Sequence, residues 1–107
     1  MPGRLDLRTI FRERLKAVRE ARGLSQKQLG VKAGLDAFVA STRINRYEMG
    51  VHEPDLATIE RMAGALGVAA AYFLADSERL ARLISEFHSL TDSEKDQILD
   101  TLGRFTR

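Results

Sequence analysis

The 107-residue sequence has no cysteine and no long apolar run, and each absence narrows the class of protein. Without cysteine the chain forms no disulfides and has no thiol chemistry, which favours a cytoplasmic protein. No apolar run approaches the roughly 18 residues of a membrane-spanning helix, so no membrane association is expected. The two histidines, His52 and His88, have no partner ligands at metal-binding spacing, so no metal site is predicted.

The combinations of residues that catalysis needs are also missing. No nucleophile with a base and an orienting group can be assembled, and there is no phosphate-binding glycine loop. We therefore expect neither an enzyme nor a cofactor. The chain after residue 76 is too short to form a small-molecule effector domain. A hydrophobic fraction of 44% and this length fit one globular domain with a helical appendage.

Charge is distributed unevenly along the chain, although the net charge is only +2. Residues 1–50 hold 11 Lys/Arg against 5 Asp/Glu, a balance of +6, and residues 51–107 hold 6 against 10, a balance of −4. A basic half joined to an acidic half suggests that one end meets a polyanion. The alternative is that these charges only solvate helix surfaces.

The stretch 24–54 predicts two short helices joined by a turn. Ser25 and Gln28 have the spacing of a capping box at the start of the first helix, and Gly34 ends it. A second helix is expected over 41–49. Its apolar side carries Ile44 and Tyr47, and its opposite side is polar.

The motifs of this stretch resemble the Cro/CI-type helix-turn-helix family of DNA-binding regulators. The resemblance covers about 7–76 and is carried by Leu24-Ser25-Gln26, Ala33-Gly34, Ile44, Tyr47-Glu48, Gly50, Pro54 and Leu66-Gly67-Val68. Family members usually have about four fewer residues between Gly34 and Glu48. Residues 35–40 (LDAFVA) are therefore a lengthened turn, which leaves the start of the second helix open and its end defined.

The resemblance implies an all-α fold, with a five-helix DNA-binding domain over 5–76 and a C-terminal helical hairpin over 77–107. The first helix is expected over 7–22 and a short fifth helix over 68–74. The apolar residues expected to pack in the core are Leu7, Ile10 or Phe11, Leu15, Val18, Leu35, Phe38, Leu56, Ile59, Met62, Ala63, Leu66, Tyr72, Phe73 and Leu74.

The same resemblance assigns the site residues on double-stranded DNA. Base contacts are expected from Ser41, Thr42, Asn45 and Arg46. Phosphate contacts are expected from Ser25, Gln26, Lys27, Arg43 and His52. The alternatives without a DNA contact are that Ser25 only caps its helix and that Asn45 and Arg43 are only solvated. Arg19 and Glu48 are expected to form a structural salt bridge, with Glu48 as a general base as the alternative.

Pattern alone describes the C-terminal hairpin. Residues 77–90 place their apolar side chains on one face, and Thr91 and Glu94 form a second capping box before an amphipathic helix with its apolar side inward. The hairpin either completes the core or presents an apolar face to a second copy. For that second role the dimer-interface candidates are Leu83, Phe87, Ile98, Leu102 and Phe105.

The sequence therefore predicts a sequence-specific DNA-binding transcriptional regulator, a repressor acting as a homodimer with helix 41–49 in the major groove. One alternative is an antitoxin whose hairpin binds a protein partner. Another is a protein-interaction module that kept the fold and lost DNA binding.

Overall fold

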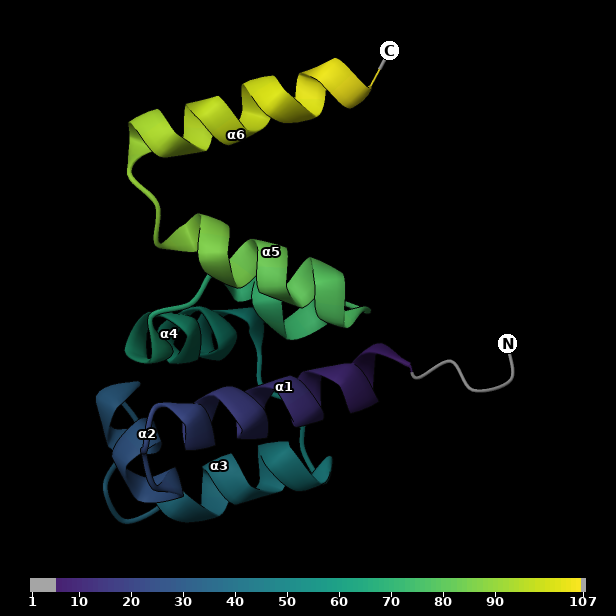
Figure 1. Ribbon diagram of the computed structural model, residues 1–107. Coiled ribbons are helices and arrows are strands. Elements are labelled where there is room, and N and C mark those ends of the chain that lie inside the picture. The colour runs from purple at the N-terminus through teal and green to yellow at the C-terminus, as the bar shows by residue number, and fades with distance from the viewer. Residues whose placement is uncertain (1–5, 107) are drawn as a thin grey trace.

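The computed structural model describes residues 6–106, and every regular element in that range is a helix (Figure 1). The elements are α1 (Leu7–Ala21), α2 (Gln26–Lys32), α3 (Ala40–Met49), α4 (Leu56–Leu66), the 3-10 helix η1 (Ala70–Leu74), α5 (Glu78–His88) and α6 (Asp92–Phe105). The predicted all-α class is confirmed. Leu5, where the predicted first domain begins, lies outside the described residues.

Local signals in the sequence explain where these helices begin and end. The residues whose side chains cap a helix N-terminus are Asp6, Ser25, Asp55, Ser77 and Thr91. Both predicted capping boxes form, because Gln28 and Glu94 accept hydrogen bonds from the backbone of their cap residues. Gly50 and Gly67 end α3 and α4 in the left-handed conformation, with φ of 76° and 70°.

The core is formed where α1, α2, α3, α4 and η1 meet. Its largest fully buried side chains are Phe73, Leu15, Leu29, Ile44 and Met62. Phe11 packs edge-on against Phe73, with ring centroids 5.4 Å apart. Arg14 of α1 donates hydrogen bonds to the carbonyl of Ala75, so η1 is fixed to α1 at its end.

Several residues predicted to be buried are exposed, and each has a local reason. Leu7 and Leu56, the latter 84% exposed, are the first residues of α1 and α4 and lie at the edge of the core-facing stripe. Leu74 closes η1 but is about half exposed. Phe38 is 98% exposed, because Leu35 and Ala40 already fill the core on either side of the turn.

Smaller differences concern the bounds of the elements. The helix α3 begins at Ala40, one residue before the expected start, and its end at Met49 is as predicted. The helix α1 ends at Ala21 with Arg22 as its C-cap. Ile10 and Phe11, which the sequence left as alternatives, are both buried. The expected fifth helix is a 3-10 helix that begins at Ala70.

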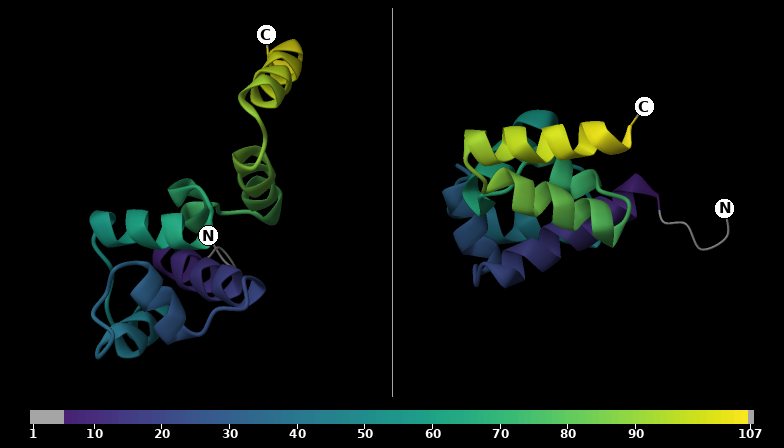
Figure 2. Two further views of the ribbon diagram at one scale, coloured as in Figure 1. Left: turned by 90° about the vertical axis from the view of Figure 1, so that its left-hand side faces the viewer. Right: turned by 45° about the horizontal axis from the view of Figure 1, so that its top comes forward.

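The C-terminal helices extend away from the rest of the chain. α5 packs against η1 through the buried Ala81, whereas α6 has no buried residue (Figures 1 and 2). Figure 1 and the left view of Figure 2 place α6 at the opposite end of the molecule from α3. The expected inward face of α6 is therefore wrong for a single chain: Ile98, Leu99, Leu102 and Phe105 are all exposed.

Candidate nucleic-acid interface

The helix α3 lies along one edge of the bundle, with one face on the core and the other in solvent (Figure 1). Ile44 and Tyr47 are buried on the inner face. The four predicted base-contacting residues are all exposed: Ser41, Thr42, Asn45 and Arg46. An anchored helix with a protruding polar edge is the geometry that a reading helix needs to enter the major groove.

Close packing of α2 against α3 fixes the start of α3. A Cβ atom added to Gly30 of α2 would lie 2.6 Å from the Cβ of Ala40, the first residue of α3. Both residues are buried. Only glycine permits this approach, so α2 and the N-terminus of α3 are held as one unit.

A buried ion pair fixes the other half of α3 to α1. Arg19 Nε lies 2.6 Å from Glu48 Oε2, and Arg19 Nη2 lies 3.1 Å from Glu48 Oε1. The side chains are only 11% and 3% exposed. The hydrogen bond to Glu48 raises the pKa of Arg19 above its usual value. The ion pair expected from the sequence is thus present, and it joins α1 to α3 with both side chains largely removed from solvent.

Gln26 extends this network toward the exposed face of α3. Its Nε2 donates to Glu48 Oε1 at 3.2 Å and to Asn45 Oδ1 at 3.1 Å. The predicted phosphate contact of Gln26 would therefore compete with hydrogen bonds that join α2 to α3. Asn45 is tied to α2, so bidentate reading of adenine would share or break that hydrogen bond.

Ser25 and Lys27, the other predicted phosphate-contacting residues near α2, differ in whether their side chains are free to contact a phosphate. Ser25 Oγ accepts a hydrogen bond from the backbone N–H of Gln28 at 3.0 Å, so the hydroxyl serves as a cap. Lys27 is exposed beside it. Of the three predicted phosphate-contacting residues near α2, Lys27 alone is positively charged.

The C-terminal end of α3 is covered by an arginine that the sequence did not single out. Arg12 Nη1 donates to the carbonyl of Met49 at 3.3 Å, and Arg12 Nη2 donates to Thr9 Oγ1 at 3.1 Å. A Cβ on Gly50 would lie 2.7 Å from Arg12 Cδ, so a side chain there would displace the arginine. The basic stripe of α1 was visible in the sequence, but its contact across 37 residues was not.

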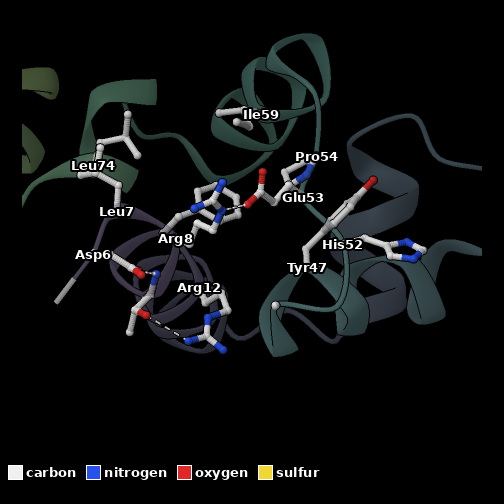
Figure 3. Close-up of a pocket in the computed structure, with 13 residues that line it drawn as sticks. Asp6, Leu7, Arg8, Arg12, Tyr47, His52, Glu53, Pro54, Ile59 and Leu74 are labelled. Atoms are coloured by element: carbon white, nitrogen blue, oxygen red, sulfur yellow. Dashed lines mark hydrogen bonds and ion pairs between the residues drawn. The ribbon is translucent and has the colours of Figure 1, made fainter.

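The loop after α3 contains a second residue pair that the sequence did not predict. Arg8 of α1 forms an ion pair with Glu53 at the rim of a cavity of about 380 Å³ (Figure 3). The ion pair with Arg8 neutralises the Glu53 carboxylate next to His52. The side chain of His52 is exposed. Arg43 Nη2 donates to the hydroxyl of Tyr47 at 3.0 Å on the same side. Arg8, Arg43 and His52 thus border one hollow next to α3, together with Glu53.

The predicted dimer residues lie far from this surface. Leu83 and Phe87 of α5 and Ile98 and Leu102 of α6 line a groove of about 350 Å³ between the two helices. The ammonium group of Lys95 lies 5.6 Å from the centre of the Phe87 ring. The hairpin is therefore open, with an apolar groove where a closed hairpin would have a core.

Within residues 6–106, no group of three or more side chains is arranged to hold a metal ion. Neither His52 nor His88 belongs to such a group. None of the helices within the described residues combines the length and the hydrophobicity of a membrane-spanning segment.

The fold and the exposed edge of α3 together define a helix-turn-helix DNA-binding module. The family model for helix-turn-helix proteins matches residues 15–73. A crystal structure of the transcriptional regulator BswR matches 87% of this chain and 92% of its own, with a TM-score of 0.80 and 41% identity. That coverage exceeds what residues 5–76 supply, so the match continues into the C-terminal helices.

Curated relatives agree with this class. The immunity repressor protein of Bacillus phage phi105 is 34% identical over 85 residues, which cover 78% of this chain and 54% of the repressor. The cryptic phage CTXphi transcriptional repressor RstR of Vibrio cholerae is 29% identical over 96 residues, 83% of this chain and 81% of that protein. The chain thus spans only about half the length of the first relative.

The chain belongs to the Cro/CI-type helix-turn-helix family, as the sequence motifs indicated. Residues 15–73 therefore form the helix-turn-helix DNA-binding module that defines this family.

Proposed function

We propose that this protein is a sequence-specific repressor that binds double-stranded DNA as a homodimer, with α3 in the major groove. The observation that carries the proposal is the exposed edge of α3 on a helix whose opposite face is fixed at both ends. The names of the phage relatives support repression. Repression would follow from occupancy, because a protein seated on the promoter blocks its use.

Residue roles follow from the chemistry of each exposed side chain. The guanidinium of Arg46 matches the O6 and N7 acceptors of guanine, and Thr42 offers a methyl group or a hydroxyl to a base edge. Ser41 and Asn45 flank them. Lys27, Arg43 and His52 would meet phosphates, with Ser25 and Gln26 chiefly holding the motif in shape.

The homodimer is supported by the exposed apolar surface of the C-terminal helices. Six large apolar residues there are exposed by between about a third and four-fifths: Leu80, Leu83, Ile98, Leu99, Leu102 and Phe105. At roughly 200 Å² for a fully exposed large side chain, they present about 600 Å² of apolar surface. A stable interface buries about 800 Å² per partner, polar rim included. A second copy, joined about a two-fold axis, would cover this surface and place two α3 helices on successive half-sites.

The open groove between α5 and α6 also favours a second candidate function. A helix from a different protein, such as the toxin of an antitoxin pair, would fit the same apolar lining. The oligomeric state of the purified protein separates the two candidates, because only the first requires a dimer.

The test of DNA reading is selection of bound sequences from random duplex DNA with the wild type, Arg46→Ala and Arg79→Ala. Arg79 is an exposed arginine of α5 and serves as the matched control. We expect wild type and Arg79→Ala to recover one motif. Arg46→Ala should lose preference at one position of each half-site, at a cost of about 1–3 kcal/mol per half-site.

Salt dependence distinguishes this function from a protein-interaction module. Binding to the selected site should weaken steeply with ionic strength, because phosphate contacts release counterions. Recovery of the same motif by Arg46→Ala would contradict the recognition assignment. Failure of the wild type to select any sequence, with no salt-dependent binding, would contradict the function itself.

A further inference from the structure

Phe38 combines a fixed backbone with an almost fully solvated ring. It lies in the lengthened turn between α2 and α3, two residues before the helix begins, and is 98% exposed. Burying a phenyl ring is normally among the larger favourable contributions that a side chain makes. The chain leaves that contribution unused at this position, although Phe11 and Phe73 are both buried.

The turn holds this ring in a defined place. The backbone N–H of Phe38 donates to Asp36 Oδ1 at 2.8 Å, and that of Val39 donates to the Asp36 carbonyl at 3.1 Å. On one side Leu35 is anchored in the core and its N–H bonds the carbonyl of Gly30 at 2.9 Å. On the other side Ala40 is locked against Gly30.

Phe38 lies in the turn that leads into the exposed row of α3. Ser41 and Thr42, at the start of the helix, follow Phe38 by three and four residues, and Asn45 and Arg46 follow them at the same spacing within α3. Within the helix, residues at this spacing share one face. Reading helices contact base edges mainly with their N-terminal residues, so Phe38 would lead the row into the groove.

The chemistry of the ring selects its target among the groups that the groove offers. A phenyl ring has no hydrogen bond to give a base edge, but it makes apolar contact with the C5 methyl group of thymine. The Asp36 carboxylate next to the turn disfavours approach to phosphate. Resting on the proposed DNA-reading function, we propose that Phe38 is a specificity-determining residue that packs on a thymine methyl group at one position of each half-site.

The test uses the full chain and its selected site, in which each thymine in turn is replaced by deoxyuridine. This replacement removes one methyl group and leaves base pairing unchanged. For the wild type, one thymine position in each half-site should be sensitive. Replacing a single thymine at that position should weaken binding about fourfold, the equivalent of one buried methyl group. For Phe38→Ala the same replacement should have no effect. Phe38→Leu should restore part of the sensitivity.

Other outcomes overturn the proposal in distinguishable ways. If every replacement affects wild type and Phe38→Ala equally, Phe38 does not read thymine, whereas Arg46→Ala would still report on the proposed function. A change in oligomeric state of Phe38→Ala, measured by light scattering, would show that the ring serves a protein interface instead. If the wild type selects no DNA sequence, the result contradicts both the proposed DNA-reading function and the thymine contact of Phe38.

Discussion

At the scale of single residues, Arg19 and Glu48 form a largely buried ion pair between α1 and α3. Burial removes both charges from water, and Arg19 donates three hydrogen bonds in compensation. Two are to the Glu48 carboxylate, and the third, from Nη1, is to the carbonyl of Leu24 at 2.9 Å. A buried ion pair is costly when one partner is lost, because the other remains charged and unpaired. The pair therefore positions α3 as well as stabilising the fold, and Gln26 transmits that position to Asn45.

We expect Glu48→Gln to lower the free energy of unfolding by about 3–5 kcal/mol, because it leaves the buried guanidinium without its counter-charge. Urea unfolding followed by circular dichroism measures the loss. The matched control is Glu86→Gln, which breaks the exposed pair between Arg82 and Glu86 on α5. That control should cost no more than about 0.5 kcal/mol. Equal losses in the two variants would contradict the structural role given to Glu48.

At the scale of elements, helix caps and helix ends were predictable from the sequence, and the burial of particular side chains was less so. The capping boxes at Ser25 and Thr91 depend on residues three apart, so local chemistry settles them. The exposure of Phe38 and Leu56 depends on which neighbours already fill the core, and that is a tertiary property. The contacts of Arg8 and Arg12 across 45 and 37 residues are also tertiary, so their part in the site emerged only from the structure.

The cap of α4 provides a pH prediction. Hydrogen bonds from Thr58, first its side chain and then its backbone, hold the pKa of Asp55 below the usual 3.8. A carboxylate with a depressed folded pKa contributes stability above its unfolded value and loses it as the pH falls through the folded one. The wild type should therefore become less stable as the pH drops under about 4, and protonation of Asp55 should account for part of that loss.

The variant Asp55→Asn isolates that contribution, because asparagine also caps helices but does not titrate. Its urea midpoint should decline less between pH 4 and 2 than that of the wild type, as measured on both proteins in parallel. Asp55→Ala, which removes the cap at every pH, should be less stable than either at neutral pH. An identical acid slope in wild type and Asp55→Asn would show that other carboxylates account for the whole effect.

At the scale of the whole molecule, the two ends of the chain have different surfaces. The α3 end is basic and polar along its exposed edge, and the α5–α6 end is acidic and exposes large apolar side chains. The sequence indicated both surfaces through the charge balance and the amphipathic pattern. It left open whether the apolar face of α6 packs within its own chain, because periodicity identifies a face and not its partner. The structure leaves that face uncovered, and a second copy is the proposed partner.

That proposal makes a prediction about oligomeric state that does not depend on DNA. Ile98→Glu places a charge in the apolar face of α6, and a carboxylate buried in an interface without a partner costs several kcal/mol. The wild type should have the mass of a dimer in light scattering at micromolar concentration, and Ile98→Glu the mass of a monomer. Because α6 has no buried residue within its own chain, the variant should keep its helical circular dichroism.

Gln97→Glu is the matched control, since it adds the same charge one position earlier, on the polar side of the helix. It should remain dimeric and bind the selected DNA site as tightly as the wild type. Ile98→Glu should bind each half-site separately, and lose the cooperative affinity that comes from joining two reading helices. A dimeric Ile98→Glu would place the interface elsewhere. A monomeric wild type would favour a different protein as the occupant of the groove.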